Sequence, residues 1–173
     1  MRKENKILSL KEYCDPCGAY CCSHGTTIGS PIISEDEKKR IIRHYERKHP
    51  YVAKGFQKIT LTKEHYYVIL EKPDKTCYFI KESNCLIQAA KPLDCLIYPI
   101  KAVYESEISH IIDISCPASK FLTHEFIETA KKLALESVKR FDRATYAHWL
   151  ENFVGWVKKP TAKKLEEWLK SIE

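Results

Sequence analysis

The placement of cysteine constrains this chain more than any other feature of its sequence. All eight cysteines lie between positions 14 and 116 of a chain of 173 residues. A chain of this length can bury a hydrophobic core and has little need of covalent staples, so structural disulfides are disfavoured. In a reducing compartment, thiols in this number indicate metal binding or catalysis instead. We therefore expect a cysteine-cluster metal-binding domain at residues 1–120 and a helical extension at residues 121–173 packed on it.

The first residues of the chain give no sign of a targeting segment. Charges of both signs occur within residues 1–6, and the apolar stretch at residues 7–10 is shorter than the roughly 7–15 residues of a signal-peptide core. No apolar run approaches the roughly 20 residues of a membrane span. We therefore expect a cytoplasmic protein that does not bind membranes. The net charge of +6 comes from interleaved acidic and basic residues, which is more typical of a mixed surface than of a nucleic-acid-binding face.

The hydrophobic pattern predicts an α+β fold, with a small antiparallel sheet beside cysteine-rich metal-binding loops and closed by C-terminal helices. Residues 13–29 are expected to form a loop around metal. Ser34 and Glu37 have capping-box spacing, which predicts a helix that opens at Ser34 and ends near His49. Strand-like runs occupy residues 56–61, 65–70 and 77–80, and a hairpin is predicted between residues 100–104 and 108–114.

After Cys116 the apolar residues recur with the period of an α-helix, and Thr123 is predicted to cap the first helix. We interpret the apolar stripes of these helices as core packing in preference to a cofactor site. The stripes fall at residues 126–141, 146–157 and 165–172.

The first group of cysteines combines two spacings. Cys14 and Cys17 are two residues apart, which lets a tight loop direct both sulfurs at one ion. Cys21 and Cys22 are adjacent, and neighbouring side chains point in different directions along a backbone. We therefore expect their sulfurs to point apart, so that they serve two metal centres or only one of them is a ligand. A vicinal disulfide, which requires a strained peptide, is the disfavoured alternative.

The second group consists of Cys77, Cys85 and Cys95. Prolines on both sides of Cys95 make the backbone around it rigid. Apolar neighbours would bury the site and protect its thiolates from oxidation. Any one of the three could be a buried core cysteine, but three of them in addition to the first group indicate a shared site. Neither group alone completes two sites, so we expect residues 14–22 to lie beside Cys85 and Cys95.

Two further residues have weaker signals. Cys116 follows a predicted strand, and we favour a ligand over a core thiol there. His24 lies two residues after Cys22 and is interpreted as facing solvent in preference to binding metal. The candidate metal ligands are therefore Cys14, Cys17, Cys21, Cys22, Cys77, Cys85, Cys95 and Cys116.

These cysteines and their neighbours resemble the signature of the CxxCxxCC family, described as zinc- or iron-chelating proteins, whose pattern also occurs in flagellin lysine N-methylases. The resemblance covers about residues 14–117 and implies a cysteine-held metal with a role in modifying a protein or a cofactor. One extra residue, Tyr20, stands before the Cys21–Cys22 pair. The motif stands in this sequence as Cys14, Cys17, Cys21, Cys22, Cys77, Phe79, Ile80, Cys85, Ile87, Lys91, Pro92, Cys95, Leu96, Tyr98 and Pro99.

At two positions the chain departs from the family pattern. Lys91 and Leu96 stand where the family carries arginines. Arginine forms paired hydrogen bonds with carboxylate or phosphate, whereas lysine acts as a point charge and leucine makes no ionic contact. If the family's arginines bind an anionic substrate, this chain would bind a different one or none.

The number of thiols restricts the kind of metal that could bind, but it says little about the function. Seven or eight thiolates would satisfy two four-coordinate zinc sites, or one iron–sulfur cluster and one further ion. Sulfur ligands select zinc, copper(I) or iron–sulfur, and the uneven spacings here tilt the interpretation towards iron–sulfur.

Three functions are compatible with such a centre. The favoured one is a metal- or cluster-binding protein that assists or performs the modification of a protein or cofactor, with another protein as its partner. A metal or cluster carrier and a zinc-stabilised nucleic-acid-binding module are the alternatives. No dinucleotide or phosphate loop is present, and the sequence identifies no catalytic residue.

Overall fold

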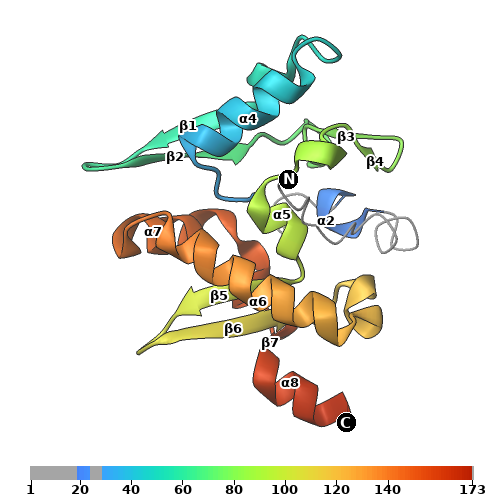
Figure 1. The fold of residues 1–173 in the computed structure, drawn as a ribbon, viewed down its shortest axis with the longest axis vertical. Helices are drawn as coiled ribbons and strands as arrows, with labels where there is room; N and C mark the ends of the chain where they lie inside the picture. Colours follow the sequence, from blue (N-terminus) through green and yellow to red (C-terminus); the bar gives the residue numbers. More distant parts are fainter. Residues whose placement is uncertain (1–18, 24–28, 173) are drawn as a thin grey trace, which may run out of the picture.

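The computed structural model describes residues 19–23 and 29–172, and it has an α+β architecture with small antiparallel sheets and C-terminal helices, as predicted (Figure 1). The α-helices are α2 (Tyr20–Ser23), α4 (Glu35–Tyr45), α5 (Leu93–Ile97), α6 (His124–Lys139), α7 (Arg143–Phe153) and α8 (Leu165–Ile172). The strands are β1 (Phe56–Thr60), β2 (His65–Ile69), β3 (Ile80–Lys81), β4 (Asn84–Cys85), β5 (Ile100–Tyr104), β6 (Ile108–Asp113) and β7 (Ala162–Lys164). Short 3₁₀ helices occupy η1 (Val52–Gly55), η2 (Gln88–Ala90), η3 (Pro117–Phe121) and η4 (Gly155–Lys158).

Local sequence signals account for the start of α4. The Ser34 hydroxyl accepts a hydrogen bond from the Glu37 amide at 3.3 Å, and the Glu37 carboxylate accepts one from the Ser34 amide at 3.4 Å. This is the predicted capping box, and it satisfies amides that the helix itself leaves without partners. The helix ends at Tyr45, slightly before the predicted limit at His49.

Within the described residues, the strands pair in three separate antiparallel sheets. β1 pairs with β2, β3 with β4, and β6 lies between β5 and β7. The predicted strands at residues 56–61 and 65–70 pair with each other, with Phe56 opposite Ile69, and the predicted hairpin is confirmed, with Ile100 opposite Ile112. The predicted strand at residues 77–80 is wrong for most of its length, because Cys77 makes only an isolated bridge and β3 begins at the end of the run.

The C-terminal helices follow the predicted stripes. The Thr123 hydroxyl accepts a hydrogen bond from the Phe126 amide at 3.2 Å, which confirms the predicted cap of α6. α6 packs against α5 and β5, and β7 adds a third strand to β5 and β6 (Figure 1). Residues after position 120 therefore contribute both helices and a strand. The domain boundary near residue 120 stays a prediction.

Two hydrophobic cores share β2 as a common wall. Side chains alternate along a strand, so Tyr66 and Val68 belong to the first core while Tyr67 and Ile69 belong to the second. The first core lies among α6, α7 and the three-stranded sheet; its buried residues include Ile100, Ile112, Phe126, Ala134, Tyr146, Trp149 and Trp156. The second core lies beneath α4; its buried residues are Ile33, Ile41, Tyr45, Val52, Tyr67, Ile69, Phe79, Ile87 and Ala90.

Over residues 19–23 and 29–172, no helix combines the length and the apolar character needed to cross a membrane.

Candidate metal centre

The structure brings the two cysteine groups together at one cavity of about 50 Å³. Cys21 packs against the first core, whereas Cys77, Cys85 and Cys95 pack against the second, so the cavity lies where the two cores meet. Cys21 and Cys22 therefore line one cavity with Cys85 and Cys95, whereas the expectation that the two groups reach one metal centre stays a prediction. Cys14, Cys17 and His24 lie outside the described residues. The cysteines that line this cavity are Cys21, Cys22, Cys77, Cys85, Cys95 and Cys116.

Helix α2 presents the adjacent cysteines. The sequence predicted a loop here, but residues 20–23 form one helical turn, and Ala19 before it has a φ of 55°. The backbone carbonyl of Cys22 accepts a hydrogen bond from the Cys77 amide at 2.8 Å. This bond ties α2 to the connection between β2 and β3, so the two segments hold their thiols side by side.

The remaining thiols come from short elements. Cys85 lies in β4 and pairs with Ile80 of β3. Cys95 lies in α5, a helix that the sequence interpretation did not predict. Cys116 is only 3% exposed and directly precedes η3. Because none of these elements has a long periodic pattern, only their tertiary contacts determine where the sulfurs lie.

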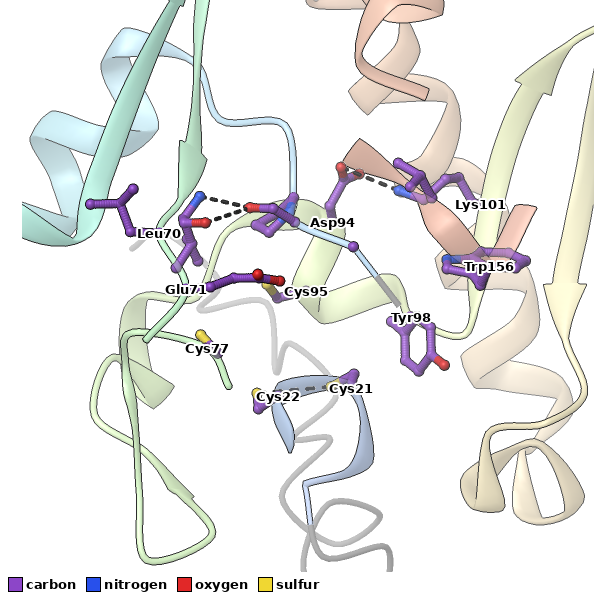
Figure 2. Close-up of a pocket in the computed structure, with 15 residues that line it drawn as sticks. Cys21, Cys22, Leu70, Glu71, Cys77, Asp94, Cys95, Tyr98, Lys101 and Trp156 are labelled. Atoms are coloured by element: carbon purple, nitrogen blue, oxygen red, sulfur yellow. Dashed lines mark hydrogen bonds and ion pairs between the residues drawn. The ribbon is translucent and has the colours of Figure 1, made fainter. Parts of the chain in front are cut away.

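The sulfurs of Cys21 and Cys22 are 3.9 Å apart, and a dashed line marks this contact in Figure 2. The expectation that they point apart is wrong. In a helix, neighbouring side chains are separated by about 100° around the axis, whereas in a strand they point to opposite faces. Two sulfurs at about 2.3 Å from one tetrahedral zinc would be about 3.8 Å apart. The observed separation therefore suits a pair of ligands on one ion.

The described cysteines alone do not surround one point. Within the part of the chain that the structure describes, no three His, Cys, Asp or Glu side chains are arranged so that they could hold one metal ion. The donor chemistry nevertheless fits a sulfur-binding metal, because six thiols line a single small cavity. A complete site needs either rotation of these side chains or ligands from outside the described residues, where Cys14 and Cys17 lie.

Hydrogen bonds between thiols shift their pKa values in opposite directions. Contacts with the thiols of Cys21 and Cys77, together with the charge of Lys91, lower the pKa of Cys22 well below its usual value, against the effect of burial. The same contact with Cys22, together with burial, raises the pKa of Cys77. Burial raises the pKa of Cys95. Cys22 is therefore the thiolate that its neighbours stabilise, and thiolates are the form that binds metal.

A second cavity of about 80 Å³ lies against the same sulfurs (Figure 2). Four cysteines, Cys21, Cys22, Cys77 and Cys95, line both cavities. The second cavity adds the charged side chains of Glu71, Asp94 and Lys101, which the sequence interpretation did not single out, and it shares the motif residue Tyr98 with the first cavity. The Glu71 side chain extends across the cavity towards Cys95, and partial burial raises the pKa of its carboxyl (Figure 2).

Tyr98 is held in place by a buried carboxylate. The Tyr98 hydroxyl donates a hydrogen bond to Asp113 at 2.7 Å, and Asp113 is fully buried. The Ser115 hydroxyl and amide donate to the other oxygen of Asp113 at 2.6 and 3.0 Å. Burial and the nearby charges of Cys116 and Asp113 raise the pKa of Tyr98, so its phenol stays protonated beside the sulfurs.

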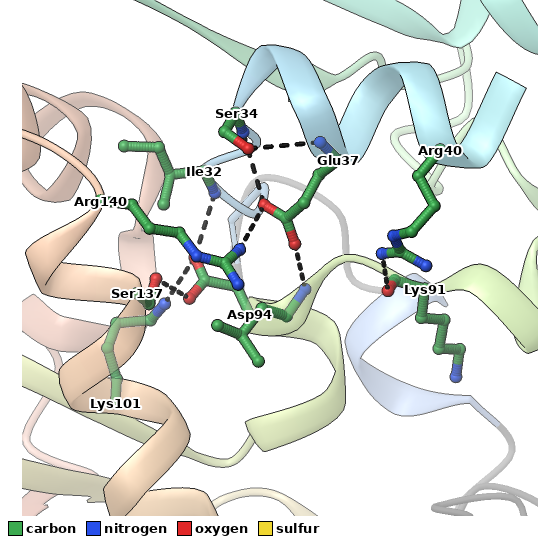
Figure 3. Close-up of polar contacts among 10 residues, drawn as sticks. Ile32, Ser34, Glu37, Arg40, Lys91, Asp94, Lys101, Ser137 and Arg140 are labelled. Carbon is green, nitrogen blue, oxygen red and sulfur yellow. Dashed lines mark hydrogen bonds and ion pairs between the residues drawn. The ribbon is translucent and has the colours of Figure 1, made fainter. Parts of the chain in front are cut away.

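Two buried carboxylates fix the helix that carries Cys95 (Figure 3). Asp94 accepts hydrogen bonds from the Ser137 hydroxyl at 2.9 Å and from the Ile32 amide at 3.1 Å, and it forms an ion pair with Lys101 at 3.3 Å. These contacts join α5 to α6, β5 and the segment before α4. Because the partners are buried and satisfied, α5 has little freedom to shift.

Glu37 performs the same task at the start of α5. Its carboxylate accepts a hydrogen bond from the Leu93 amide at 2.9 Å and forms an ion pair with Arg140 at 2.9 Å (Figure 3). The residue that closes the capping box of α4 thus also satisfies an amide in the first turn of α5. Its role in the capping box was visible in the sequence, whereas its role at α5 was not.

A third cavity of about 350 Å³ adjoins the second, with Ser30, Ile69 and Glu71 among the residues that line both. Gly29 is also shared and has a φ of +111°, a conformation that side chains rarely adopt. A Cβ atom at Gly29 would lie 2.1 Å from the carbonyl oxygen of Phe153, so the backbones approach too closely for any other residue.

Comparison with known proteins finds no counterpart for this arrangement. No known protein family, no curated protein and no solved structure matches the chain. The resemblance to the CxxCxxCC family therefore rests on the cysteine motif itself, and the site has to be interpreted from its own chemistry.

Proposed function

We propose that this protein binds zinc or an iron–sulfur cluster through its cysteines and that the bound centre serves the modification of a protein or a cofactor in the cytoplasm. One observation carries the proposal. Thiols from α2, the β2–β3 connection, β4, α5 and the start of η3 meet at one cavity of about 50 Å³. These segments are far apart in sequence, and six thiols at one cavity favour a shared ligand over six separate core cysteines.

The size and lining of this cavity favour an inorganic centre over an organic ligand. A single water has a share of about 30 Å³ of liquid volume, so the cavity has space for little more than an ion and its immediate surroundings. Sulfur-rich coordination then selects zinc, copper(I) or iron–sulfur, and the sulfur separation in α2 suits a tetrahedral ligand pair.

The neighbouring cavities favour a modifying role over that of a carrier. A carrier hands over its cargo from exposed sulfurs, but Cys116 is buried and the other described cysteines are only partly exposed. The cavity that Glu71 lines lies against the sulfurs and shares Ser30, Ile69 and Glu71 with a cavity of about 350 Å³. That volume lies within the roughly 300–1,000 Å³ of ordinary ligand sites, so a reactant has room beside the centre.

The described surface gives less support to nucleic-acid binding. Binders of single strands present aromatic side chains between basic ones along one face. The large hydrophobic side chains that are exposed in residues 19–23 and 29–172 are Tyr51, Phe121 and Ile172, which lie on separate elements.

Metal analysis and visible absorption of anaerobically purified protein test the proposal. We expect bound zinc or iron, with a sulfide-containing chromophore if the centre is an iron–sulfur cluster. Cys22→Ser and Cys95→Ser should each lower the bound metal, whereas Tyr98→Phe, which lines both cavities without a thiol, should retain it. Protein that neither retains nor takes up any metal under anaerobic conditions would refute the proposal.

The adjacent cysteines provide a second test. If the sulfurs of Cys21 and Cys22 bind one ion, as their separation of 3.9 Å suggests, Cys21→Ser and Cys22→Ser should lose the same metal in the same amount. Unequal losses would instead indicate two centres, or one ligand and one core thiol. Metal stoichiometry of the two variants, measured side by side, separates these outcomes.

A further inference from the structure

A cavity of about 340 Å³ is not used by the metal proposal. It is formed by residues 48–52 after α4, by the connection between β2 and β3 and by the residues that follow β4. Its volume lies within the roughly 300–1,000 Å³ of ordinary ligand sites. Among the described residues that line it, there is no cysteine and no carboxylate. A ligand bound there would meet neither a thiol nor a negative side chain of the lining.

One part of the lining is apolar and buried. Val52, Phe79 and Ile87 belong to it, and each is at most 3% exposed. The rings of Tyr78 and Phe79 pack edge to face with their centroids 5.2 Å apart. A Cβ atom at Gly55 would lie 2.3 Å from the Phe79 ring, so the absence of a side chain at Gly55 lets this ring pack closely against the backbone. This part of the cavity offers contact area to a flat, apolar group.

The other part of the lining carries positive charge. Lys48 and Lys72 both line the cavity, and the ammonium group of Lys54 lies 4.9 Å from the centroid of the Tyr51 ring. Within the part of the chain that the structure describes, neither Lys48 nor Lys72 forms a salt bridge. The Lys72 ammonium group donates a hydrogen bond to the Ile80 carbonyl, but an ammonium group has three donors and can bind an anion as well.

The two carboxylates next to Lys72 in sequence are engaged elsewhere. Asp74 accepts hydrogen bonds from the amide and the hydroxyl of Thr76 at 3.0 and 2.7 Å, and Glu71 lines the cavities beside the cysteines. The charge of two lysines is therefore available to a ligand. A phosphate monoester carries a charge of about −1.5 to −2 at pH 7 and three acceptor oxygens, which matches two lysines better than a carboxylate does. Lysine binds phosphate as a point charge.

Tyr51 places an exposed aromatic side chain beside these lysines. It is 64% exposed, and its backbone carbonyl accepts a hydrogen bond from the Tyr78 hydroxyl at 3.5 Å, which joins two sides of the cavity. Aromatic rings stack on one another in offset or edge-to-face arrangements, and the contact removes apolar surface from water. Tyr51 is thus suited to pack against a ring that enters the cavity.

We propose that this cavity binds a small phosphate monoester with a flat aromatic group, such as a nucleoside monophosphate or an aryl phosphate. Lys48 and Lys72 bind the phosphate, and the ring packs against Tyr51 and the apolar part of the lining. The inference goes beyond the proposed function and does not depend on it, because no thiol takes part in this site.

Isothermal titration calorimetry of the protein as purified tests the choice of ligand. The probes are AMP, phenyl phosphate, adenosine and inorganic phosphate. AMP or phenyl phosphate should bind at least about 10-fold more tightly than adenosine or inorganic phosphate, because each of the latter lacks one of the two groups that the cavity recognises. Binding of AMP alone would identify a nucleotide, and binding of phenyl phosphate alone an aryl phosphate. If neither binds with a Kd below about 1 mM, or if adenosine or inorganic phosphate binds equally well, the inference is overturned.

Substitutions test the place of binding. Lys48→Met and Lys72→Met should each weaken binding roughly 10-fold or more, because each removes a charged donor. Lys58→Met is the matched control, since Lys58 is an exposed lysine of β1 outside the cavity. If Lys72→Met does not fold, Lys72→Gln replaces it, because glutamine keeps a donor for the Ile80 carbonyl.

The aromatic contact has its own pair of variants. Tyr51→Ala should weaken binding by about 5-fold or more, as expected for the loss of a stacking partner, whereas Phe121→Ala, at a residue 66% exposed, should not. Unchanged binding in either lysine variant or in Tyr51→Ala would overturn the inference, as would an equal loss in Lys58→Met. Metal analysis of the same samples tests the proposed function separately, so that either proposal can fail without the other.

Discussion

The first core and the cysteine region of this molecule are stabilised in different ways. In the first core, helices α6 and α7 and the sheet of β5, β6 and β7 bury large side chains such as Trp149 and Tyr146 completely. Around the cysteines, β3 and β4 have two residues each, α2 has four and α5 has five. Isolated helices shorter than about 12–15 residues are marginal in water. The comparison indicates that apolar packing stabilises the first core. The cysteine region depends instead on hydrogen bonds and ion pairs of buried carboxylates and on the ligand that its thiols bind.

The largest expected effect is on the first core. Trp149 is fully buried, and its indole donates a hydrogen bond to the Ser30 carbonyl at 2.9 Å. Trp149→Ala should lower the free energy of unfolding by about 3–5 kcal/mol, because it leaves a cavity and an unsatisfied carbonyl. Urea unfolding measures it. The loss should be the same with and without a chelator, and Tyr51→Ala, at a residue 64% exposed, should have little effect. If Trp149→Ala lowered the free energy of unfolding only in metal-loaded protein, the first core would also depend on metal, and the proposed difference between the two regions would be wrong.

Removal of metal should affect the cysteine region selectively. If the metal is present at about 1,000 times its dissociation constant, it contributes about 4 kcal/mol to stability. Chelation should therefore lower the melting temperature, and hydrogen exchange should accelerate in β3, β4 and α5 while β5 and β6 stay protected. An unchanged melting temperature, or equal acceleration in both regions, would contradict the comparison.

A smaller effect is expected at the start of α6, whose cap involves no thiol. Thr123→Ala removes the acceptor of the 3.2 Å bond from the Phe126 amide and should cost about 1 kcal/mol. Thr123→Ser retains the hydroxyl and serves as its matched control. Urea midpoints of both variants should be independent of metal, and a chelator-dependent difference between them would show that the two regions are energetically coupled.

The smallest effect concerns the pH dependence of the first core. Burial lowers the pKa of His110 below 6.5, although its contact with the Lys131 carbonyl at 3.1 Å opposes the shift. Below about pH 6.5 the unfolded chain then binds more protons than the folded one. The stability contributed by neutral His110 is thus present above that pH and decreases as the pH falls. His110→Gln should reduce the dependence of the urea midpoint on pH between about pH 7.5 and 5.5. If that dependence is unaltered, groups other than His110 cause it.

Elements with strong local signals were predictable, and elements defined by their partners were not. The capping box of Ser34, the cap of Thr123 and the hairpin of β5 and β6 follow from neighbouring residues, and all three are confirmed. β7 has three residues, two of them lysines, and exists because it pairs with β6. α5 is likewise too short for a periodic pattern, and the carboxylates of Glu37 and Asp94 hold it in place.

By itself, the sequence determined that the thiols are concentrated in one part of the chain and that α4, α6 and α7 form, because residue type and local spacing suffice for both. The tertiary structure decided which sulfurs are neighbours. The distance between the sulfurs of Cys21 and Cys22 depends on a helical turn that the local sequence did not predict. It also decided that Lys91 lines the same cavity as those cysteines. Long-range packing sets the positions of these side chains. The cysteines come from segments that are distant in sequence, so the distances between their sulfurs are fixed only when those segments pack together.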